Sequence, residues 1–291
     1  MESLNDEEFQ QAVLEQNEIL RSVDTRLAAG VDLLRQQNQK LEQIRYSVAA
    51  DMQREYFSKV LARQLSFLET LDEVSSQRLS MARYGDGELG LAADPTRNIV
   101  FQRGSFVLAR SLRDVISIPQ DGLLVCLPGV TVGVSWMTWN ARYWGIISEL
   151  IPQDRRWGIA SVSRSDGFEA EGAPLVDAWR SCWSGRDVLV VTGKGSRFEL
   201  VPELFSSARS VGFVLGAPKD AFQAINELEK QVLKRRPDLV LLALGPAGTV
   251  LSSRLHEAGV QALDIGHLSN SYNEHFKHGP RPERLPIDQR D

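Results

Sequence analysis

Two carboxylates two residues apart stand among the glycines of the stretch MARYGDGELG, residues 81–90. If this stretch is an extended loop, Asp86 and Glu88 project to the same side of the chain. Two hard oxygen ligands, completed by water and phosphate oxygens, suit Mg²⁺ or Mn²⁺, and Gly85 and Gly87 leave space for a bulky anion. Asp86 and Glu88 are therefore a candidate site for a divalent metal. The alternative is an acidic turn whose carboxylates are only solvated or cap the next segment.

Three arginines are candidates for binding an anion. Arg83 precedes the acidic pair, while Arg164 and Arg197 each follow a serine, Ser163 and Ser196, just past an apolar run. A guanidinium can bind phosphate or carboxylate as a fork, so these side chains are expected to contact a phosphate group. The alternative for each arginine is simple solvation at the surface.

A glycine turn occurs in LALGPAGTVLSSRL, residues 242–255. The order strand, turn and helix places Gly245, Gly248 and Thr249 at a helix start, where free backbone N–H groups bind anions. The segment lacks both the dinucleotide-binding GxGxxG pattern and the Walker lysine, so it indicates no particular nucleotide. Tight packing of strand on helix, with no ligand, accounts for the spacing equally well.

A candidate general base follows the last apolar run, in DIGHLSNSYNEH, residues 264–275. Asp264 and His267 stand three residues apart, and an Asp or His at a strand end can accept a proton from a substrate hydroxyl. Asp264 is the first choice for this role. In the alternative, Asp264 caps a turn and His267 is a partly buried histidine with satisfied hydrogen bonds.

The elements that must position these residues begin near residue 79. Short Val- and Leu-rich runs without alternation predict strands buried on both faces of a mainly parallel sheet, and helical segments separate them. This predicts a doubly wound, Rossmann-like α/β domain with helices on both faces, whose ligand crevice lies beyond the carboxyl ends of the strands. The expected strands are 79–84, 122–128, 157–162, 187–193, 211–218, 238–246 and 261–266. The expected helices are 104–117, 131–150, 171–183, 199–208, 219–235 and 247–258.

Residues 1–50 carry a different pattern, in which apolar residues recur at a strict seven-residue interval. This pattern predicts a coiled-coil seam and a homo-oligomer joined through the segment. If the leucines occupy d positions, Asn17 and Asn38 occupy a positions, and Asn there favours a parallel dimer. If they occupy a positions instead, the d positions include Gln16, Gly30 and Gln37. The alternative is a single amphipathic helix packed on the body of the protein. The repeating residues are Val13, Leu20, Leu27, Leu34, Leu41 and Val48.

The chain therefore has four expected segments. They are a coiled coil at 1–50, a connecting helix at 51–78, the α/β domain at 79–275 and a loose, proline-rich, charged tail at 276–291.

Composition narrows the function and the location. The 291 residues carry a net charge of −5, which argues against nucleic acid as the main partner. The acidic N-terminus is unlike a secretory signal, and no run approaches the roughly 20 apolar residues that cross a bilayer, so we expect a cytoplasmic protein. Cys126 and Cys182 stand far apart without neighbouring histidines and are expected to be buried thiols.

Taken together and in order, the motifs resemble the GT-D fold glycosyltransferases over about residues 78–275. The matching stretches are RYGDGE, SVSR, GKGSR, PELFSSARSVGFVLGAPKDAF, LLALGPAGTVLSSRL and QALDIGHL. The resemblance implies a metal-dependent transferase in which a DxE motif, here Asp86 and Glu88, binds the metal and a nucleoside diphosphate. It also implies that other residues line or support the site, namely Arg83, Ser163, Arg164, Ser196, Arg197, the 245–249 turn and the Asp264–His267 segment.

The resemblance thus implies a transferase that moves a hexose, glucose as the first choice, from a UDP-sugar to a hydroxyl of a bacterial surface glycan or glycoprotein. Such a protein would have Mn²⁺ or Mg²⁺ as cofactor and partners that hold it at the inner face of the membrane. Family members often follow the Asp-Ile-Gly-His segment with further acids, where this chain has Ser269, Asn270 and Ser271, so the base and the acceptor stay open. The alternative function is a non-catalytic module that binds a glycan or nucleotide and is organised by its coiled coil.

Overall fold

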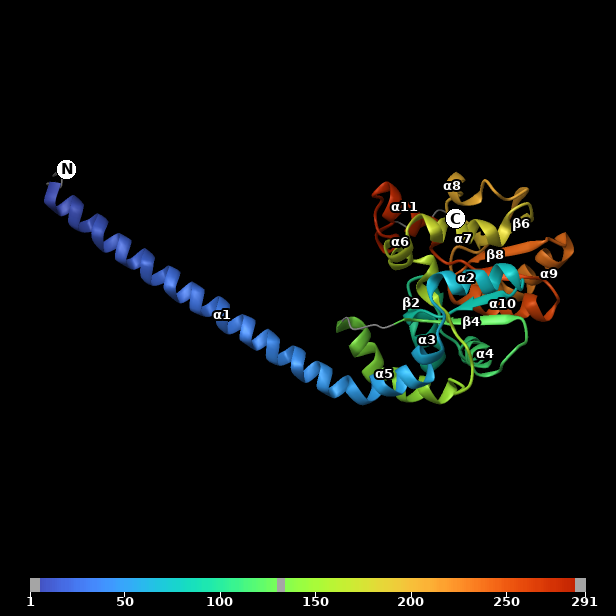
Figure 1. Cartoon of the computed structure of the whole chain (residues 1–291), viewed down its shortest axis with the longest axis horizontal. Coiled ribbons are helices and arrows are strands. Elements are labelled where there is room, and N and C mark those ends of the chain that lie inside the picture. The colour runs from blue at the N-terminus through green and yellow to red at the C-terminus, as the bar shows by residue number, and fades with distance from the viewer. Residues whose placement is uncertain (1–5, 130–133, 286–291) are drawn as a thin grey trace. The chain divides into compact units, whose positions relative to one another are not determined.

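Seven parallel strands form the centre of the body of the protein (Figure 1). The computed structural model describes residues 6–129 and 134–285 and divides into two units, residues 1–53 and 54–291. In spatial order the strands are β5 (Gly158–Ile159), β4 (Leu123–Leu127), β1 (Ser80–Arg83), β9 (Ala262–Asp264), β8 (Leu239–Ala243), β6 (Asp187–Gly193) and β7 (Ser210–Gly216). Each of the seven expected strands is present, and the doubly wound fold is confirmed.

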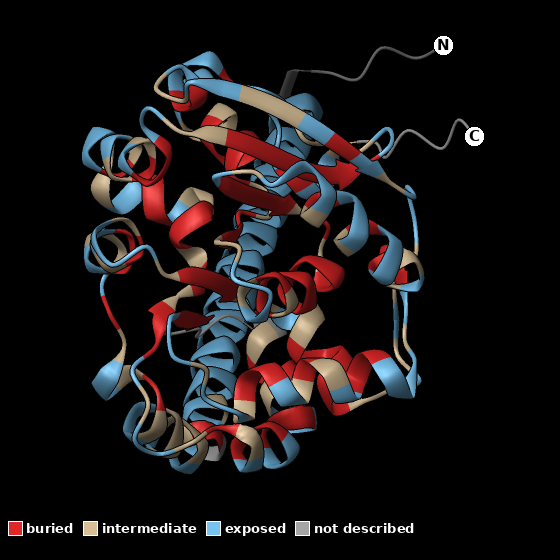
Figure 2. Ribbon diagram, turned by 90° about the vertical axis from the view of Figure 1, so that its right-hand side faces the viewer, coloured by how far each residue is buried: buried red, intermediate tan, exposed pale blue. Residues whose placement is uncertain are grey.

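Helices cover both faces of this sheet, as the alternating pattern predicted. One face packs against α2 (Phe67–Ser76), α6 (Ser165–Glu171), α7 (Ala173–Trp183), α8 (Pro202–Phe205) and α11 (Leu268–Lys277). The other carries α3 (Asp86–Ala93), α4 (Phe106–Ser117), α5 (Val134–Leu150), α9 (Ile225–Arg235) and α10 (Pro246–Glu257). Figure 2 shows buried residues along the central strands and on the inward sides of the helices.

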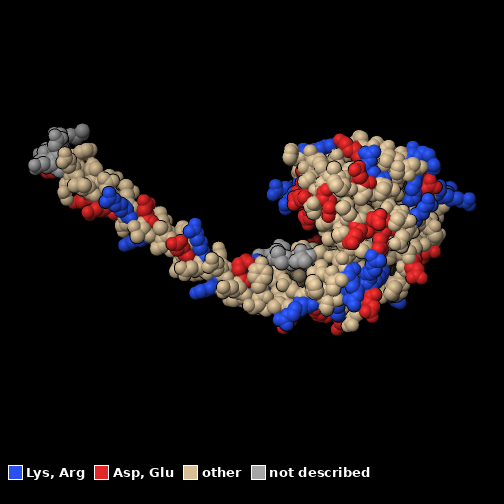
Figure 3. Space-filling model, viewed as in Figure 1, with Lys and Arg blue, Asp and Glu red and all other residues tan. Residues whose placement is uncertain are grey.

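On the face of the α/β body shown in Figure 3, acidic and basic side chains are mixed rather than separated into patches of one charge. Within the described residues, no helix is long and apolar enough to cross a membrane. Cys126 and Cys182 are buried free thiols, as expected.

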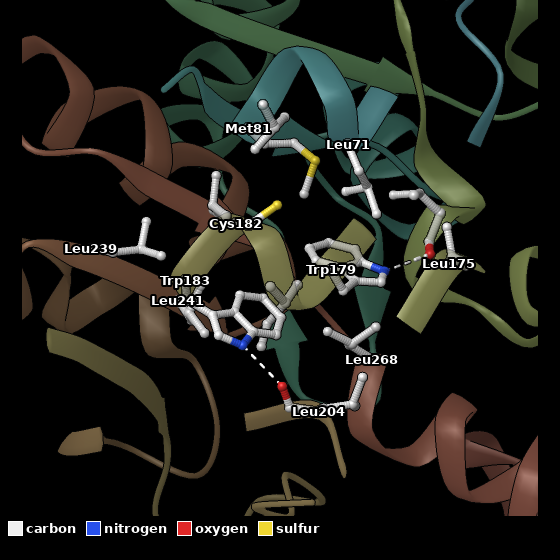
Figure 4. Close-up of a cluster of buried hydrophobic side chains, with 14 of the residues drawn as sticks. Leu71, Met81, Leu175, Trp179, Cys182, Trp183, Leu204, Leu239, Leu241 and Leu268 are labelled. Atoms are coloured by element: carbon white, nitrogen blue, oxygen red, sulfur yellow. Dashed lines mark hydrogen bonds between the residues drawn. The ribbon is translucent and has the colours of Figure 1, made fainter. Parts of the chain in front are cut away.

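A cluster of large apolar side chains fixes α7 and α8 against the sheet (Figure 4). Trp183 stacks between Trp179 and Phe205, with ring centroids 5.7 Å and 5.2 Å apart. Its indole N–H donates to the Leu204 carbonyl at 3.0 Å, so burying this ring leaves no unpaired donor. The cluster holds the strands whose carboxyl ends carry the candidate residues.

The first unit belongs to one long helix, α1 (Asp6–Lys59), whose last residues lie in the second unit. The heptad residues Val13, Leu20, Leu27, Leu34 and Leu41 are 39–63% exposed. The side chain of Val48 lies outside the described part of the chain, as do residues 1–5.

The expected connecting helix at 51–78 is interrupted. After α1 ends, a 3-10 turn η1 (Leu61–Arg63) follows, and Gln64 forms a bridge to Trp157 beside the sheet. A new helix, α2, then begins at a capping box in which Ser66 and Glu69 bond each other's backbone N–H groups. The Ser-x-x-Glu spacing is the usual signature of a helix start, so the sequence carried the signal for this break.

Other differences concern short elements. The hairpin β2 (Asn98–Ile99) and β3 (Gln102–Arg103), the helices α3, α6 and α11, and the 3-10 turns η2 (Ala160–Ser163) and η3 (Ala221–Ala224) were not expected. The tail is also ordered further than expected, because α11 extends to Lys277 and a 3-10 turn η4 (Pro282–Arg284) follows it. The expectation of a loose tail is therefore wrong for residues 276–285, and residues 286–291 lie outside the described residues.

Candidate active site

The candidate residues gather where β1 and β9 end side by side. From this pair the strand order runs through β4 to β5 in one direction and through β8 and β6 to β7 in the other. Ligands of open α/β sheets bind at such a reversal, beyond the carboxyl ends of the strands. Arg83 is the last residue of β1 and Asp264 the last of β9, so both stand at this point.

Arg83 acts as a clamp between three chain segments. Its Nε donates to the Asp264 carbonyl at 2.7 Å, and Nη1 donates to the Ala160 carbonyl at 2.9 Å. Its Nη2 lies 3.3 Å from Asp264 Oδ1. All three nitrogens therefore contact protein acceptors, which ties the ends of β1 and β9 to η2.

Both carboxylate oxygens of Asp264 are held by the protein. Oδ1 accepts from the Gly266 N–H at 3.1 Å as well as from Arg83, and Oδ2 lies 3.2 Å from the Thr249 hydroxyl. The same hydroxyl is 2.8 Å from the Arg83 carbonyl, and Gly248 lets α10 approach the carboxylate closely. Asp264 is 3% exposed, and burial raises its pKa against the opposing effect of Arg83. Thr249 is therefore placed to orient Asp264.

Gly266 closes this clamp, which yields a first prediction. Its φ is +47°, and a Cβ there would lie 1.9 Å from Arg83 Nη2. Gly266→Ala should destabilise the fold by on the order of 3 kcal/mol, measured by urea unfolding, because it strains the backbone and displaces Arg83.

Gly259 provides the matched control for this prediction. Its φ is +78°, and nothing lies within 4 Å of its Cβ position. Gly259→Ala should cost only the backbone strain, about 1 kcal/mol. Equal costs for the two variants would contradict the clamp.

The acidic pair lies in the first turn of a helix. Gly85 is the N-cap of α3, Asp86 is its first residue, and Glu88 Oε2 turns back to accept the Gly85 N–H at 2.9 Å. Residues i and i+2 of a helix project in different directions, so the expected extended loop is wrong and the space beside Gly85 is taken by the Glu88 carboxylate. Asp86 is exposed and makes no hydrogen bond or ion pair within the described residues.

The electrostatics of Glu88 fit a cation ligand. Burial, with the negative charge of Asp264, raises the pKa of Glu88 to about 7 despite hydrogen bonds and the charge of Arg83. A desolvated carboxylate without a full cationic partner gains most when a cation arrives. No group of three or more His, Cys, Asp or Glu converges within the described residues. A cation here would therefore take further oxygens from water and ligand, as Mg²⁺ and Mn²⁺ do.

Three arginines act electrostatically on His267, which follows Asp264 by three residues in the chain. Burial, together with the positive charges of Arg164, Arg83 and Arg197, lowers the pKa of His267 to about 4, and the negative charge of Glu283 opposes this shift. The imidazole is thus neutral near pH 7, and its side chain makes no hydrogen bond within the described residues. The site holds an excess of positive charge at this end.

Several polar atoms near these arginines are buried without partners in the part of the chain that is described. They include Ser163 Oγ and Arg197 Nε, together with Ser269 Oγ and Ser271 Oγ at the start of α11. Buried polar atoms are normally paired, so these atoms indicate a place for water or ligand oxygens. Ser196 differs, because its hydroxyl bonds Thr192 and the Phe198 N–H and stabilises its own turn.

The glycine turn after β8 is covered. Gly245, at φ +54°, lies so close to the Phe101 ring that a Cβ would meet it at 2.4 Å, and the Gly248 N–H bonds the Gly245 carbonyl. The packing alternative therefore describes this turn better than the anion site does.

The buried histidine yields a second prediction, for stability against pH. His267 binds its proton near pH 4 when folded and near its ordinary 6.5 when unfolded. The unfolded chain therefore binds more protons between these values, so stability present above pH 6.5 is lost as the pH falls towards 4. In His267→Gln the free energy of unfolding should fall with pH by about 2 kcal/mol less than in the wild type, a figure reduced because the imidazole is partly exposed.

Urea midpoints at pH 7.5 and pH 5 measure the effect. The exposed His278 serves as control, and His278→Asn should keep the pH dependence of the wild type. If the urea midpoint of His267→Gln falls between pH 7.5 and pH 5 as much as that of the wild type, the burial of a neutral His267 imidazole is contradicted.

Sequence reasoning missed Gly266, Phe101 and Glu283. The sequence did carry a signal for the positive φ of Gly266, since a glycine just after a strand often marks a backbone conformation that other residues cannot adopt. Phe101 and Glu283 lay in segments without periodicity.

The family model for the glycosyltransferase GT-D fold matches residues 81–290. The chain belongs to the GT-D fold glycosyltransferase family. Two curated relatives carry matching activities in their names. "Glycosyltransferase GlyD" of Streptococcus pneumoniae serotype 4 is 31% identical over 77% of this chain and 30% of its own length. "Probable glycosyl transferase Gly" of Streptococcus gordonii is 29% identical over 75% of this chain and 34% of its own. The chain thus spans about a third of the length of these curated relatives.

Solved structures agree with this assignment. One, described as the domain of unknown function 1792 with a distinct glycosyltransferase fold, superposes with a TM-score of 0.68 at 26% identity, over 81% of this chain and 88% of that one. Another, described as a new glycosyltransferase from Streptococcus sanguinis, gives 0.63 at 28% identity, over 74% and 85%. The solved structures therefore agree with the GT-D fold of this chain.

Proposed function

We propose that this chain transfers a hexose, with glucose as the first choice, from a UDP-sugar to a hydroxyl of a bacterial surface glycan or glycoprotein. One observation carries the proposal. A desolvated carboxylate with a pKa near 7, Glu88, lies beside exposed Asp86 at the end of β1, while Arg164 and Arg197 supply positive charge around His267. A divalent cation and a diphosphate complement this arrangement.

Glu88 would hold Mn²⁺ or Mg²⁺ directly and Asp86 would reach the same ion through water, because the two side chains leave the first turn of α3 in different directions. When bound, the ion supplies Lewis-acid stabilisation of the departing diphosphate. Glu88 would be ionised as a ligand, because the charge of the cation would offset the burial that raises the pKa of this carboxyl group. Arg164 and Arg197 contact the remaining phosphate charge. Arg83, Thr249 and Gly266 hold Asp264, and through it the ends of β1 and β9 stay in register.

If the reaction inverts the anomeric centre, His267 is the better base. Each carboxylate oxygen of Asp264 already accepts a hydrogen bond, whereas the His267 imidazole is neutral and unbonded within the described residues. A phosphate anion beside the three arginines offsets their charge and raises the pKa of His267 towards a useful range. These contacts support His267 over Asp264, which was the first choice from the sequence.

We further propose that residues 1–50 join copies of the chain in a coiled coil. With the heptad leucines at a positions, Phe9, Val23 and Ile44 fall at d positions, and all three are 45–61% exposed. A second copy presents the same face, so the two seams bury each other. Peripheral association with a membrane glycan machinery, from the cytoplasmic side, completes the proposal.

A donor screen tests the activity. The full chain is incubated with common nucleotide sugars and Mn²⁺, and release of the nucleoside diphosphate is measured. We expect turnover of UDP-glucose above other donors, abolished by EDTA and restored by Mn²⁺. Binding of UDP in calorimetry without hydrolysis or transfer of any donor would instead support a non-catalytic binding module.

A further inference from the structure

The chain after α11 turns back towards the candidate active site. His278, at φ +55°, ends the helix, and the Gly279 N–H bonds the Asn273 carbonyl at 3.0 Å. Residues 282–284 then form the turn η4, preceded by Arg281 as its N-cap, and Pro282 is buried. We call residues 281–284 the strap.

Two carboxylates fasten the strap. Glu274 of α11 accepts from Arg281 Nε at 3.2 Å and from the Ser165 hydroxyl at the start of α6. Glu283 within the strap pairs with Arg164, the residue directly before Ser165. The strap is therefore tied to the same chain segment that carries a candidate phosphate-binding arginine.

The Glu283–Arg164 pair belongs to the electrostatics of the site. Burial raises the pKa of Glu283, but the hydrogen bond and charge of Arg164 outweigh it, so the net pKa is lowered. Arg164 and Glu283 also act in opposite directions on His267. A carboxylate thus holds the guanidinium that the proposed function assigns to the donor.

We propose that Glu283 is a built-in anionic competitor, and that the strap closes on Arg164 until the diphosphate of the donor displaces Glu283. The inference rests on the proposed function, because Arg164 must contact the donor. Exposed fractions are 33% for the Arg164 side chain and 57% for that of Glu283, so the pair is accessible to an incoming anion. A guanidinium exchanges one oxygen anion for another at little cost, since both accept the same N–H donors.

The exchange lowers the apparent affinity for the donor. An ion pair at this exposure contributes a modest free energy, so its removal should tighten binding by about twofold to fivefold. UDP with Mn²⁺ is the probe, and calorimetry on the full chain gives its dissociation constant. Glu283→Gln should bind this probe more tightly than the wild type.

The control is another exposed ion pair on α11. Glu203 pairs with Lys277 at 2.9 Å, with both side chains 45% exposed. Glu203→Gln removes a comparable pair away from Arg164 and should leave the dissociation constant unchanged. In an Arg164→Gln background, Glu283→Gln should have no further effect, because the competitor has lost its site.

Hydrogen exchange gives a second readout. The Arg284 and Leu285 N–H groups bond carbonyls of Arg281 and Pro282 in the closed strap, so UDP with Mn²⁺ should speed their exchange. If Arg164→Gln weakens UDP binding but Glu283→Gln does not tighten it, the strap is overturned and the proposed function stands. If Arg164→Gln leaves UDP affinity unchanged, the assigned donor contact fails, and the strap with it.

Discussion

Asp86→Asn and Glu88→Gln are each expected to lower metal-dependent transfer at least about a hundredfold. Each variant removes one anionic ligand, and the stabilisation that a bound cation gives to a leaving diphosphate amounts to several kcal/mol. Transfer from UDP-glucose is measured at saturating Mn²⁺. A Mn²⁺ titration then separates lost metal affinity from lost turnover.

The same variants should leave the fold intact. Asp86 is exposed and unbonded within the described residues, so Asn there changes stability by less than about 0.5 kcal/mol. The amide oxygen of Gln can still accept the Gly85 N–H that Glu88 accepts, and it avoids burying a charge. Glu88→Gln should therefore be as stable as the wild type above pH 7, or slightly more stable.

Asp94 gives a matched control at the other end of α3. It is half-buried and bonds Thr96, so Asp94→Asn changes a carboxylate of the same helix outside the site and should retain activity. Wild-type transfer rates in Asp86→Asn and Glu88→Gln would contradict metal binding by Asp86 and Glu88, which would then only begin the helix α3.

The strands were predictable because buried parallel strands have a simple signature. LLVCL of β4, for example, is buried throughout, and a short apolar run of this kind between turn residues is typical of a strand covered on both faces. The helix at Asp86 was not predictable in the same way, because Gly-Asp-Gly is also the composition of a loop. The side chain of Glu88 favours a helix here, because it accepts the Gly85 N–H at the start of α3.

The clamp at Arg83 depends on contacts that spacing cannot reveal. Arg83 and Asp264 meet only because β1 and β9 are neighbours in the sheet, although they lie far apart in the sequence. The sequence places both residues near strand ends. It therefore predicted phosphate binding for Arg83 and proton transfer for Asp264. Their mutual hydrogen bonds show that both serve the architecture of the site.

A second large effect is expected in the long helix, where Leu27→Glu combined with Leu34→Glu should convert an oligomer to a monomer of 32.5 kDa. Each leucine is 61% exposed in the single chain, and in a coiled coil it would be buried against its counterpart. Burying a leucine side chain contributes about 1.5–3 kcal/mol, and a charge at the same position adds repulsion between copies. Sedimentation equilibrium of the full chain measures the mass.

The control adds the same charges on the other side of the helix. Ala29 and Gln36 each follow a replaced leucine by two residues, about 200° further round the helix, so Ala29→Glu with Gln36→Glu should keep the oligomer. A monomeric wild type, or equal masses for the wild type and the leucine variant, would contradict self-association. The control also separates the seam from charge alone, since both double variants carry the same net charge. Only a face-specific loss identifies Leu27 and Leu34 as the contact between copies.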